Sequence, residues 1–160
     1  MIKIEISKSD IEKAKSLYEF DELNNSITKG KGNIIGAIGE VMTYNYFIEK
    51  GHDVDFNSTY DYDLIVDGFR VDVKSKATNY PPKDYFNATV ASFNTSQDCD
   101  YYLFAYVTYD HKTCYLAGYK DKEEFYSVAK FGVAGEIDRG TFRYRADCYN
   151  LQLKHLNNFK

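Results

Sequence analysis

Two aspartates and a lysine in one short stretch have the types and the spacing that metal-assisted hydrolysis requires. Residues 60–76 read YDYDLIVDGFRVDVKSK, two alternating segments joined by Asp67-Gly68. An Asp-Gly pair between alternating segments is typical of a β-hairpin with a two-residue turn. Because strand side chains alternate between faces, the pattern predicts that Asp63, Asp72 and Lys74 share one face of this hairpin.

The predicted register explains why these charges would need a cation. With the turn centred on Asp67-Gly68, Asp63 lies opposite Asp72 and Asp61 lies opposite Lys74. Directly opposed side chains have Cβ atoms about 4.5–5.5 Å apart, and like charges at that range destabilise a hairpin. We therefore expect a hard divalent ion between the two acids, with Lys74 beside it. The other face would be apolar and carry Tyr62, Leu64, Val66, Phe69, Val71 and Val73.

A helix predicted for residues 34–50 adds a third carboxylate. Asn33 is its expected N-cap and Gly51 its expected end. Gly36 and Gly39 each cost roughly 1 kcal/mol relative to alanine inside a helix, which predicts that another segment comes close to the backbone. We expect the helix to cover the charged face of the hairpin and to press Glu40 against the sheet.

These three motifs together resemble the PD-(D/E)xK nuclease superfamily, which has the restriction-endonuclease-like fold. The resemblance covers roughly residues 33–120 and depends on GAIGE, DLIV and DVK in this order, with Tyr62 standing where the motif has proline. It implies a metal-dependent nuclease, with DNA as the expected substrate, that uses Mg²⁺ or Mn²⁺ to activate water. By this resemblance, Asp63 and Asp72 are metal ligands, and the carbonyl of Val73 is a further ligand. Glu40 is a ligand or a group that orients the attacking water. Lys74 is the catalytic cation.

Several alternatives remain open from the sequence. Asp61 is either a partner of Lys74 or the metal ligand in place of Asp63. The whole cluster could also be a solvated hairpin face without chemistry. A non-catalytic acidic interaction or inhibitor protein on the same fold suits the net charge of −4, and an RNA-processing nuclease would use the same residues.

The remaining segments predict an α/β (α+β) fold with a central mixed β-sheet flanked by helices. We expect a strand at 1–6, a helix at 11–23 and a short strand near 54–56. A continuous apolar run at 100–109 predicts a central strand covered on both faces, paired with a strand at 113–119. A short helix follows at 122–130, with Phe125 and Val128 directed inward, then a loop at 131–135. Residues 85–93 and 142–145 could be strand or loop, and residues 1–160 are interpreted as one domain.

Composition restricts the function classes further. The three cysteines are widely spaced and odd in number, which favours a reducing, cytoplasmic location over a disulfide framework. No apolar run is long enough for a membrane span. The pI of about 5.4 is acidic, so the chain as a whole lacks the basic surface that is typical of nucleic-acid-binding proteins. Phosphate contacts would therefore be local. The candidates are Lys29, Lys31, Lys76, Lys83, Arg139, Arg143 and Arg145. A homodimer or a larger complex is expected, because the chain is short for a separate recognition domain.

Overall fold

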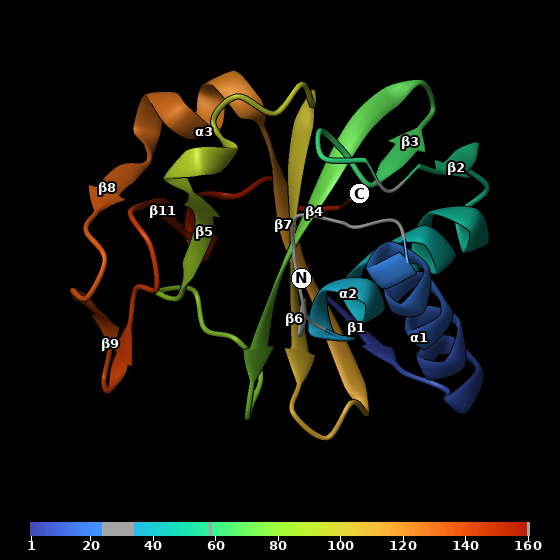
Figure 1. The fold of residues 1–160 in the computed structure, drawn as a ribbon. Coiled ribbons are helices and arrows are strands. Elements are labelled where there is room, and N and C mark those ends of the chain that lie inside the picture. Colours follow the sequence, from blue (N-terminus) through green and yellow to red (C-terminus); the bar gives the residue numbers. More distant parts are fainter. Residues whose placement is uncertain (24–33, 58, 160) are drawn as a thin grey trace.

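A computed structural model describes residues 1–23, 34–57 and 59–159, and shows an α+β protein built on a curled six-stranded mixed sheet (Figure 1). The predicted class, a central mixed sheet flanked by helices, is confirmed. Across the sheet the strands follow the order β1 (Ile2–Glu5), β7 (Thr113–Asp121), β6 (Tyr101–Thr108), β4 (Phe69–Thr78), β3 (Leu64–Val66) and β2 (Val54–Phe56).

The apolar strand β6 occupies the centre of this sheet. It pairs in parallel with β4 and antiparallel with β7. Its six inner residues are all buried, because layers cover both faces of the sheet at this point. A strand in that position must be apolar throughout, so the prediction of a central strand and of its hairpin partner is confirmed.

Two long helices, α1 (Lys8–Leu23) and α2 (Ile34–Glu49), cover one face of the sheet (Figure 1). The helix α1 begins earlier than predicted because Ser7 and Asp10 form a capping box. Ser7 Oγ accepts a bond from Asp10 N at 3.1 Å, and Asp10 Oδ2 accepts one from Ser7 N at 2.8 Å. The predicted bounds of α2 are confirmed within one residue, and Gly51 follows with a left-handed φ of 84°. The expected cap Asn33 lies outside the described residues.

Gly39 marks the point where α2 touches the sheet. A Cβ atom added there would lie 1.9 Å from Ser75 Oγ and 3.0 Å from Ser75 Cβ, on β4. A Cβ added at Gly36 would have no described atom within 4 Å. The predicted close approach is therefore right for Gly39 and wrong for Gly36, which lies one helical turn nearer the N-terminus.

The two glycines provide a matched pair of substitutions. We expect Gly39→Ala to lower the free energy of unfolding by about 1–3 kcal/mol, because α2 or Ser75 must shift to admit the methyl group. Gly36→Ala should instead raise it by about 0.5–1 kcal/mol, since alanine favours the helix and meets no obstacle. Urea unfolding of both variants measures the difference, and equal effects would contradict the contact with Ser75.

A second layer covers the opposite face of the sheet (Figure 1). It contains a three-stranded antiparallel sheet in the order β5 (Asn87–Ala91), β11 (Cys148–Gln152) and β8 (Lys130–Gly132), the helix α3 (Lys122–Val128), and a hairpin of β9 (Ile137–Arg139) and β10 (Phe142–Arg143). The single-turn helices η1 (Ser92–Asn94) and η2 (Leu153–His155) complete the layer. Its core is aromatic: Tyr102 and Phe104 of β6 pack against Phe125 of α3.

Sequence patterns predicted this second layer less well than the first. The loop expected at 131–135 is wrong in its first part, because residues 130–132 form β8 against β11. Phe125 is fully buried as predicted, whereas Val128 is 54% exposed. The ambiguous segments 85–93 and 142–145 contain strands β5 and β10.

Two general properties of the chain follow from the described residues. No described helix is both long and apolar enough to cross a membrane. Cys99, Cys114 and Cys148 are free and buried. Burial raises the pKa of Cys99 to about 11 and that of Cys114 to about 12, so these thiols are poor nucleophiles at neutral pH.

Candidate active site

The β3–β4 hairpin positions the predicted acids. Leu64 pairs with Val71 and the two-residue turn falls at Asp67 and Gly68, as predicted. These two residues have φ values of 50° and 85°, which a turn with two left-handed residues requires. Asp63 precedes β3, and its N–H donates to Val71 O at 3.0 Å. Val71 is already the strand partner of Leu64, so the regular register ends at Leu64, and Asp63 does not form the predicted strand pair with Asp72.

The helix α2 covers the apolar face of the hairpin, which corrects the expectation that it covers the charged face. Val71 and Val73 are buried in the core cluster that α2 shares with the sheet. Lys74 lies on the other side, with its Nζ 5.8 Å from the centre of the Tyr102 ring in the aromatic layer. Tyr62, predicted to share the apolar face, packs against the aromatic layer instead, because the chain leaves strand geometry before Leu64.

Asp72 is the most buried of the predicted acids, with 3% exposure. Its Oδ1 accepts a hydrogen bond from Gln97 Nε2 at 3.0 Å, and its Oδ2 lies 2.6 Å from Lys74 Nζ. No hydrogen bond of normal geometry reaches Oδ2 from the described residues, so the ammonium compensates this oxygen mainly by charge. Burial raises the pKa of Asp72, and the Lys74 charge opposes that shift.

Asp63 supplies a second carboxylate near that of Asp72. Its Oδ2 accepts a hydrogen bond from Val73 N at 2.7 Å. Burial raises the pKa of Asp63 well above its usual range, and the charges of Glu40 and Asp72 raise it further. The Val73 N–H and the Lys74 charge act in the opposite direction but do not cancel this effect.

Glu40 joins this group from α2, where its side chain is partly exposed. Its charge is the second largest cause of the raised pKa of Asp63, so the two carboxylates lie within electrostatic range of each other. The structure thus brings Glu40, Asp63, Asp72 and Lys74 to one region from α2 and from both sides of the β3–β4 turn. A carboxylate whose pKa is raised by two neighbouring acids is chemically suited to share a cation with them.

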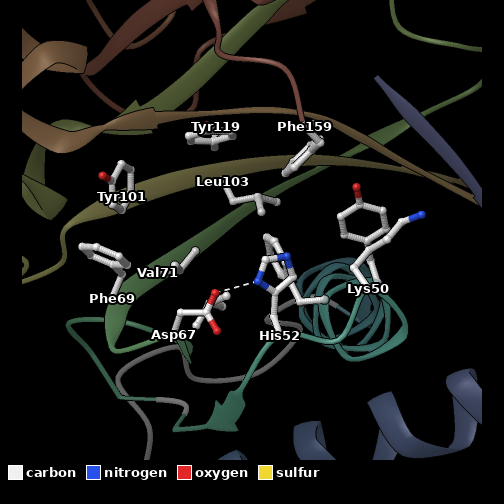
Figure 2. Close-up of a pocket in the computed structure, with 12 residues that line it drawn as sticks. Lys50, His52, Asp67, Phe69, Val71, Tyr101, Leu103, Tyr119 and Phe159 are labelled. Carbon is white, nitrogen blue, oxygen red and sulfur yellow. Dashed lines mark hydrogen bonds and ion pairs between the residues drawn. The ribbon is translucent and has the colours of Figure 1, made fainter.

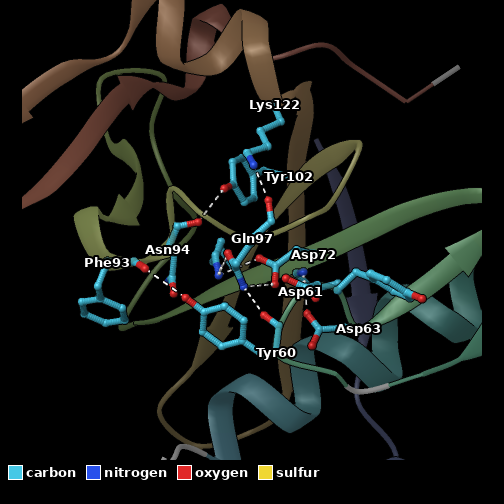
Figure 3. A network of polar contacts seen from close by, with 12 residues as sticks. Tyr60, Asp61, Asp63, Asp72, Phe93, Asn94, Gln97, Tyr102 and Lys122 are labelled. Carbon is cyan, nitrogen blue, oxygen red and sulfur yellow. Dashed lines mark hydrogen bonds and ion pairs between the residues drawn. The ribbon is translucent and has the colours of Figure 1, made fainter.

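Gln97 connects the site and was not predicted from the sequence. Its Oε1 accepts from Lys74 Nζ at 3.2 Å, and its Nε2 donates to Asp72 Oδ1 and, at 2.6 Å, to Tyr60 O. Figure 3 shows this amide between the hairpin and the loop that follows η1. Gln97 is 4% exposed, and it lies in a segment without periodicity, so no sequence signal marked it.

Replacing Gln97 should be costly because three polar groups would lose a partner. We expect Gln97→Leu to lower the free energy of unfolding by about 2–4 kcal/mol, since each unsatisfied buried group costs about 1–3 kcal/mol. Gln152→Leu, at the end of β11, is the matched control and should change stability by less than about 1 kcal/mol. Chemical denaturation of both variants tests this, and a mild effect of Gln97→Leu would show that water replaces the amide.

Asp61 has a different position from the one predicted. Its Oδ1 accepts the N–H of Asp98 at 3.0 Å and so holds the loop that carries Gln97. The described contacts of Lys74 are with Asp72 and Gln97. Asp61 therefore supports the site through the loop, and Asp63 is the acid that lies near Asp72.

The predicted phosphate contacts are dispersed. Lys76 donates to Asn87 O at 2.9 Å and to Thr89 Oγ1 at 2.6 Å, which links β4 to β5, and burial lowers the pKa of Lys76. Arg143, on β10, donates to Gly135 O at 2.7 Å. The β9–β10 hairpin lies far from β3 in Figure 1. Among the other candidates, Lys83 and Arg145 are exposed, Arg139 covers the Phe86 ring, and Lys29 and Lys31 lie outside the described residues.

The donor chemistry of the site fits a divalent ion, although the ligands are not assembled. Carboxylate oxygens are the ligands that Mg²⁺ prefers, and burial together with the charges of Glu40 and Asp72 raises the pKa of Asp63. Among the described residues, however, no three Asp, Glu, His or Cys side chains form a ready metal-binding group. The predicted ligand set of Glu40, Asp63, Asp72 and the Val73 carbonyl is therefore not preformed, because Lys74 holds Asp72 Oδ2.

A separate cavity of about 450 Å³ lies beside the turn of the hairpin, on the α2 side of the sheet. Figure 2 shows Phe69, Tyr101, Tyr119 and Phe159 around it, with an ion pair between His52 Nδ1 and Asp67 Oδ2 of 2.6 Å at its edge. Glu40, Asp63 and Asp72 are not among the described residues that line this cavity. It is therefore distinct from the carboxylate site.

Comparison with known proteins does not assign this chain to a family. No protein-family model matches this chain, and no curated protein is significantly similar to it. The proposed function therefore rests on the carboxylate site.

Proposed function

We propose that this protein is a metal-dependent nuclease that hydrolyses phosphodiester bonds, with DNA as the expected substrate, on a restriction-endonuclease-like fold. The observation that carries the proposal is the meeting of two acids beside the β3–β4 hairpin: Asp63 Oδ2 accepts from Val73 N at 2.7 Å, and Asp72 Oδ2 lies 2.6 Å from Lys74 Nζ. The charges of Glu40 and Asp72 add to burial in raising the pKa of Asp63, and perturbed carboxylates are a common feature of functional sites. The element order, with a glutamate-bearing helix before the β3–β4 hairpin, supports the same interpretation.

The residues have distinct roles in this proposal. Asp63, Asp72 and Glu40 would hold Mg²⁺ or Mn²⁺, with the Val73 carbonyl as a further ligand. When bound, such an ion supplies a Lewis acid that makes water a better nucleophile and offsets charge on phosphate. Lys74 would leave Asp72 for the phosphoryl oxygens and stabilise their negative charge. Gln97 would then keep Asp72 in place through its Oδ1.

Nuclease assays with and without divalent ions test this function. Purified protein should cleave supercoiled plasmid or labelled oligonucleotides in Mg²⁺ or Mn²⁺ and stop in EDTA. An RNA substrate in the same assay separates a DNA nuclease from an RNA-processing one. If no DNA or RNA substrate is cleaved with any divalent ion, the proposal fails.

The second candidate is a non-catalytic acidic interaction or inhibitor protein on the same fold. It is favoured by the ion pair of Asp72 and Lys74, which together with Gln97 could serve structure alone. Thermal unfolding with Mn²⁺ separates the two candidates. A nuclease site should raise Tm by binding the ion to the folded state, about 2.7 kcal/mol of stabilisation at 100 times Kd, whereas an interaction protein need not respond.

We further propose that the nuclease acts as a homodimer or as a subunit of a larger complex. Lys74, Arg70 and Lys122 near the site are engaged by groups of this chain, so further phosphate contacts would come from a second copy or from another chain. Light scattering at several concentrations measures the state of the isolated protein. If the isolated protein is a monomer at all concentrations, the homodimer is excluded and only a complex with other chains is kept.

A further inference from the structure

Two exposed aromatic side chains lie beside the carboxylate site. Phe93 in η1 is 67% exposed, the largest value for any large apolar side chain that the structure describes, and Tyr60 is 54% exposed. Figure 3 shows both rings on the same side of Gln97. Exposed rings of this kind lose no core packing when a planar ligand covers them.

Tyr60 is held at both ends although its ring is exposed. Its hydroxyl donates to Phe93 O at 3.0 Å, and Ser96 Oγ lies 3.4 Å from the same hydroxyl. Its backbone carbonyl accepts from Gln97 Nε2 at 2.6 Å. A ring fixed before binding loses little conformational entropy when a ligand covers it, which favours affinity.

The link between these rings and the acids is short. The Gln97 amide that bonds Tyr60 O also bonds Asp72 Oδ1 at 3.0 Å. The backbone of Tyr60 and the buried Asp72 carboxylate thus contact the same amide, and a phosphate next to a base on Tyr60 or Phe93 would reach Asp72 once Lys74 leaves it, as the proposed nuclease function requires.

The charges around the site do not suit a duplex. Duplex affinity comes chiefly from lysines and arginines that neutralise a series of phosphates. Near this site Lys74 pairs with Asp72, the Lys122 ammonium contacts Gln97 O, and the Arg70 guanidinium pairs with Asp98 and Asp100. The whole chain has a net charge of −4. Stacking on aromatic rings instead contributes roughly 5- to 150-fold in affinity per base and needs unpaired bases.

We infer that Tyr60 and Phe93 form a stacking platform for unpaired nucleotides, so that single-stranded nucleic acid is the substrate class of this site. The inference rests on the proposed nuclease function and narrows its substrate. It requires that bases stack on the two rings while the adjoining phosphate reaches the carboxylates.

Fluorescence anisotropy with the full-length protein in EDTA tests the platform without cleavage. The probes are labelled 20-nucleotide oligo-dT and oligo-U and a duplex of the same length. We expect Phe93→Leu and Tyr60→Leu each to weaken single-strand binding about tenfold, whereas Tyr60→Phe, which keeps the ring but loses its bonds to Phe93 O and Ser96 Oγ, should weaken it less than Tyr60→Leu. Tyr109→Leu is the matched control: Tyr109 is 54% exposed but follows the far end of β6, about 20 Å along the strand from the residue that pairs with Asp72.

Each outcome decides between the platform and the nuclease. Tighter binding of single strands than of duplex, lost in Phe93→Leu but kept in Tyr109→Leu, supports the platform even if no cleavage is found, in which case the nuclease function alone fails. Cleavage that prefers duplex, or that is unchanged in Phe93→Leu and Tyr60→Leu, overturns the platform and keeps the nuclease. Failure of every oligonucleotide to bind also overturns the platform.

Discussion

The double variant Asp72→Asn/Lys74→Met should fold as well as the unsubstituted protein and cleave no nucleic acid. Replacing both members of a buried ion pair with neutral residues is often close to neutral for stability. We therefore expect unfolding free energies within about 1–2 kcal/mol of each other. Cleavage should fall by at least about 10³-fold, which corresponds to roughly 4 kcal/mol of transition-state stabilisation. Urea unfolding and cleavage of labelled single-stranded oligonucleotides and of plasmid in Mn²⁺ measure both properties on the same preparation.

The single variants show why the double variant is informative. Lys74→Met alone leaves the buried Asp72 carboxylate with Gln97 as its remaining polar partner, and breaking a buried pair in this way costs about 3–5 kcal/mol. Loss of activity in that variant could then be loss of fold. The ion pair of Lys120, which is 16% exposed, and Glu124, which is 62% exposed, is 3.0 Å long and includes neither Asp72 nor Lys74. It gives the control: Lys120→Met/Glu124→Gln should leave cleavage unchanged and should cost less stability than Lys74→Met. A double Asp72/Lys74 variant that still cleaves at a normal rate would make the pair purely structural.

The hairpin could be predicted because its information is local. The Asp67-Gly68 turn fixes which residues face each other, and the alternation of valines with charges on β4 fixes the faces. Both features are contained within about ten residues, and the structure follows them. The prediction failed at Tyr62, where the chain is no longer held by strand pairing and turns to the aromatic layer.

The packing of α2 was predicted wrongly because the expectation followed Glu40 and not the apolar stripe of the helix. Its apolar stripe must cover an apolar surface, and the apolar face of the hairpin was the natural partner in the sequence. Glu40 could still reach Asp63 because Asp63 lies just outside β3, where the chain direction changes. Proximity of the acids therefore depends on how the chain leaves a strand, a property that residue periodicity does not encode.

The second layer and the position of Gln97 could not be predicted from the sequence, because both depend on contacts between distant segments. The strands β5, β8 and β11 have three to five residues, and β11 pairs with β5 across up to 65 positions of the chain, as between Asn87 and Gln152. Gln97 can be identified as a site residue only from the three groups that its side-chain amide contacts, and these groups lie on β4 and in the segment before β3. Such non-local contacts leave no periodic trace in the sequence.

The acid Asp63 should make the metal-free protein less stable as the pH rises. Its pKa is raised in the folded state, so folding takes up a proton between the ordinary aspartate pKa of about 3.9 and the raised value. Over that window the folded state binds more protons than the unfolded state, so stability falls with increasing pH and then levels off. The aspartates with lowered pKa, Asp67, Asp100 and Asp110, act in the opposite direction but mainly below pH 4.

Asp63→Asn should therefore raise Tm at neutral pH in EDTA and abolish cleavage. The gain in Tm should be small near pH 4 and increase through the window of the raised pKa, because asparagine carries no charge to be repelled by Glu40 and Asp72. For a domain of this size, each kcal/mol corresponds to about 2–4 °C. Saturating Mn²⁺ should stabilise the unsubstituted protein but not Asp63→Asn, which brings their Tm values together. Asp55→Asn, at an exposed position of β2, is the matched control and should behave as the unsubstituted protein at every pH. If Asp63→Asn lowers Tm at neutral pH, Asp63 is stabilised by its contact with Val73 rather than destabilised by the other acids, and the case for a shared cation is lost.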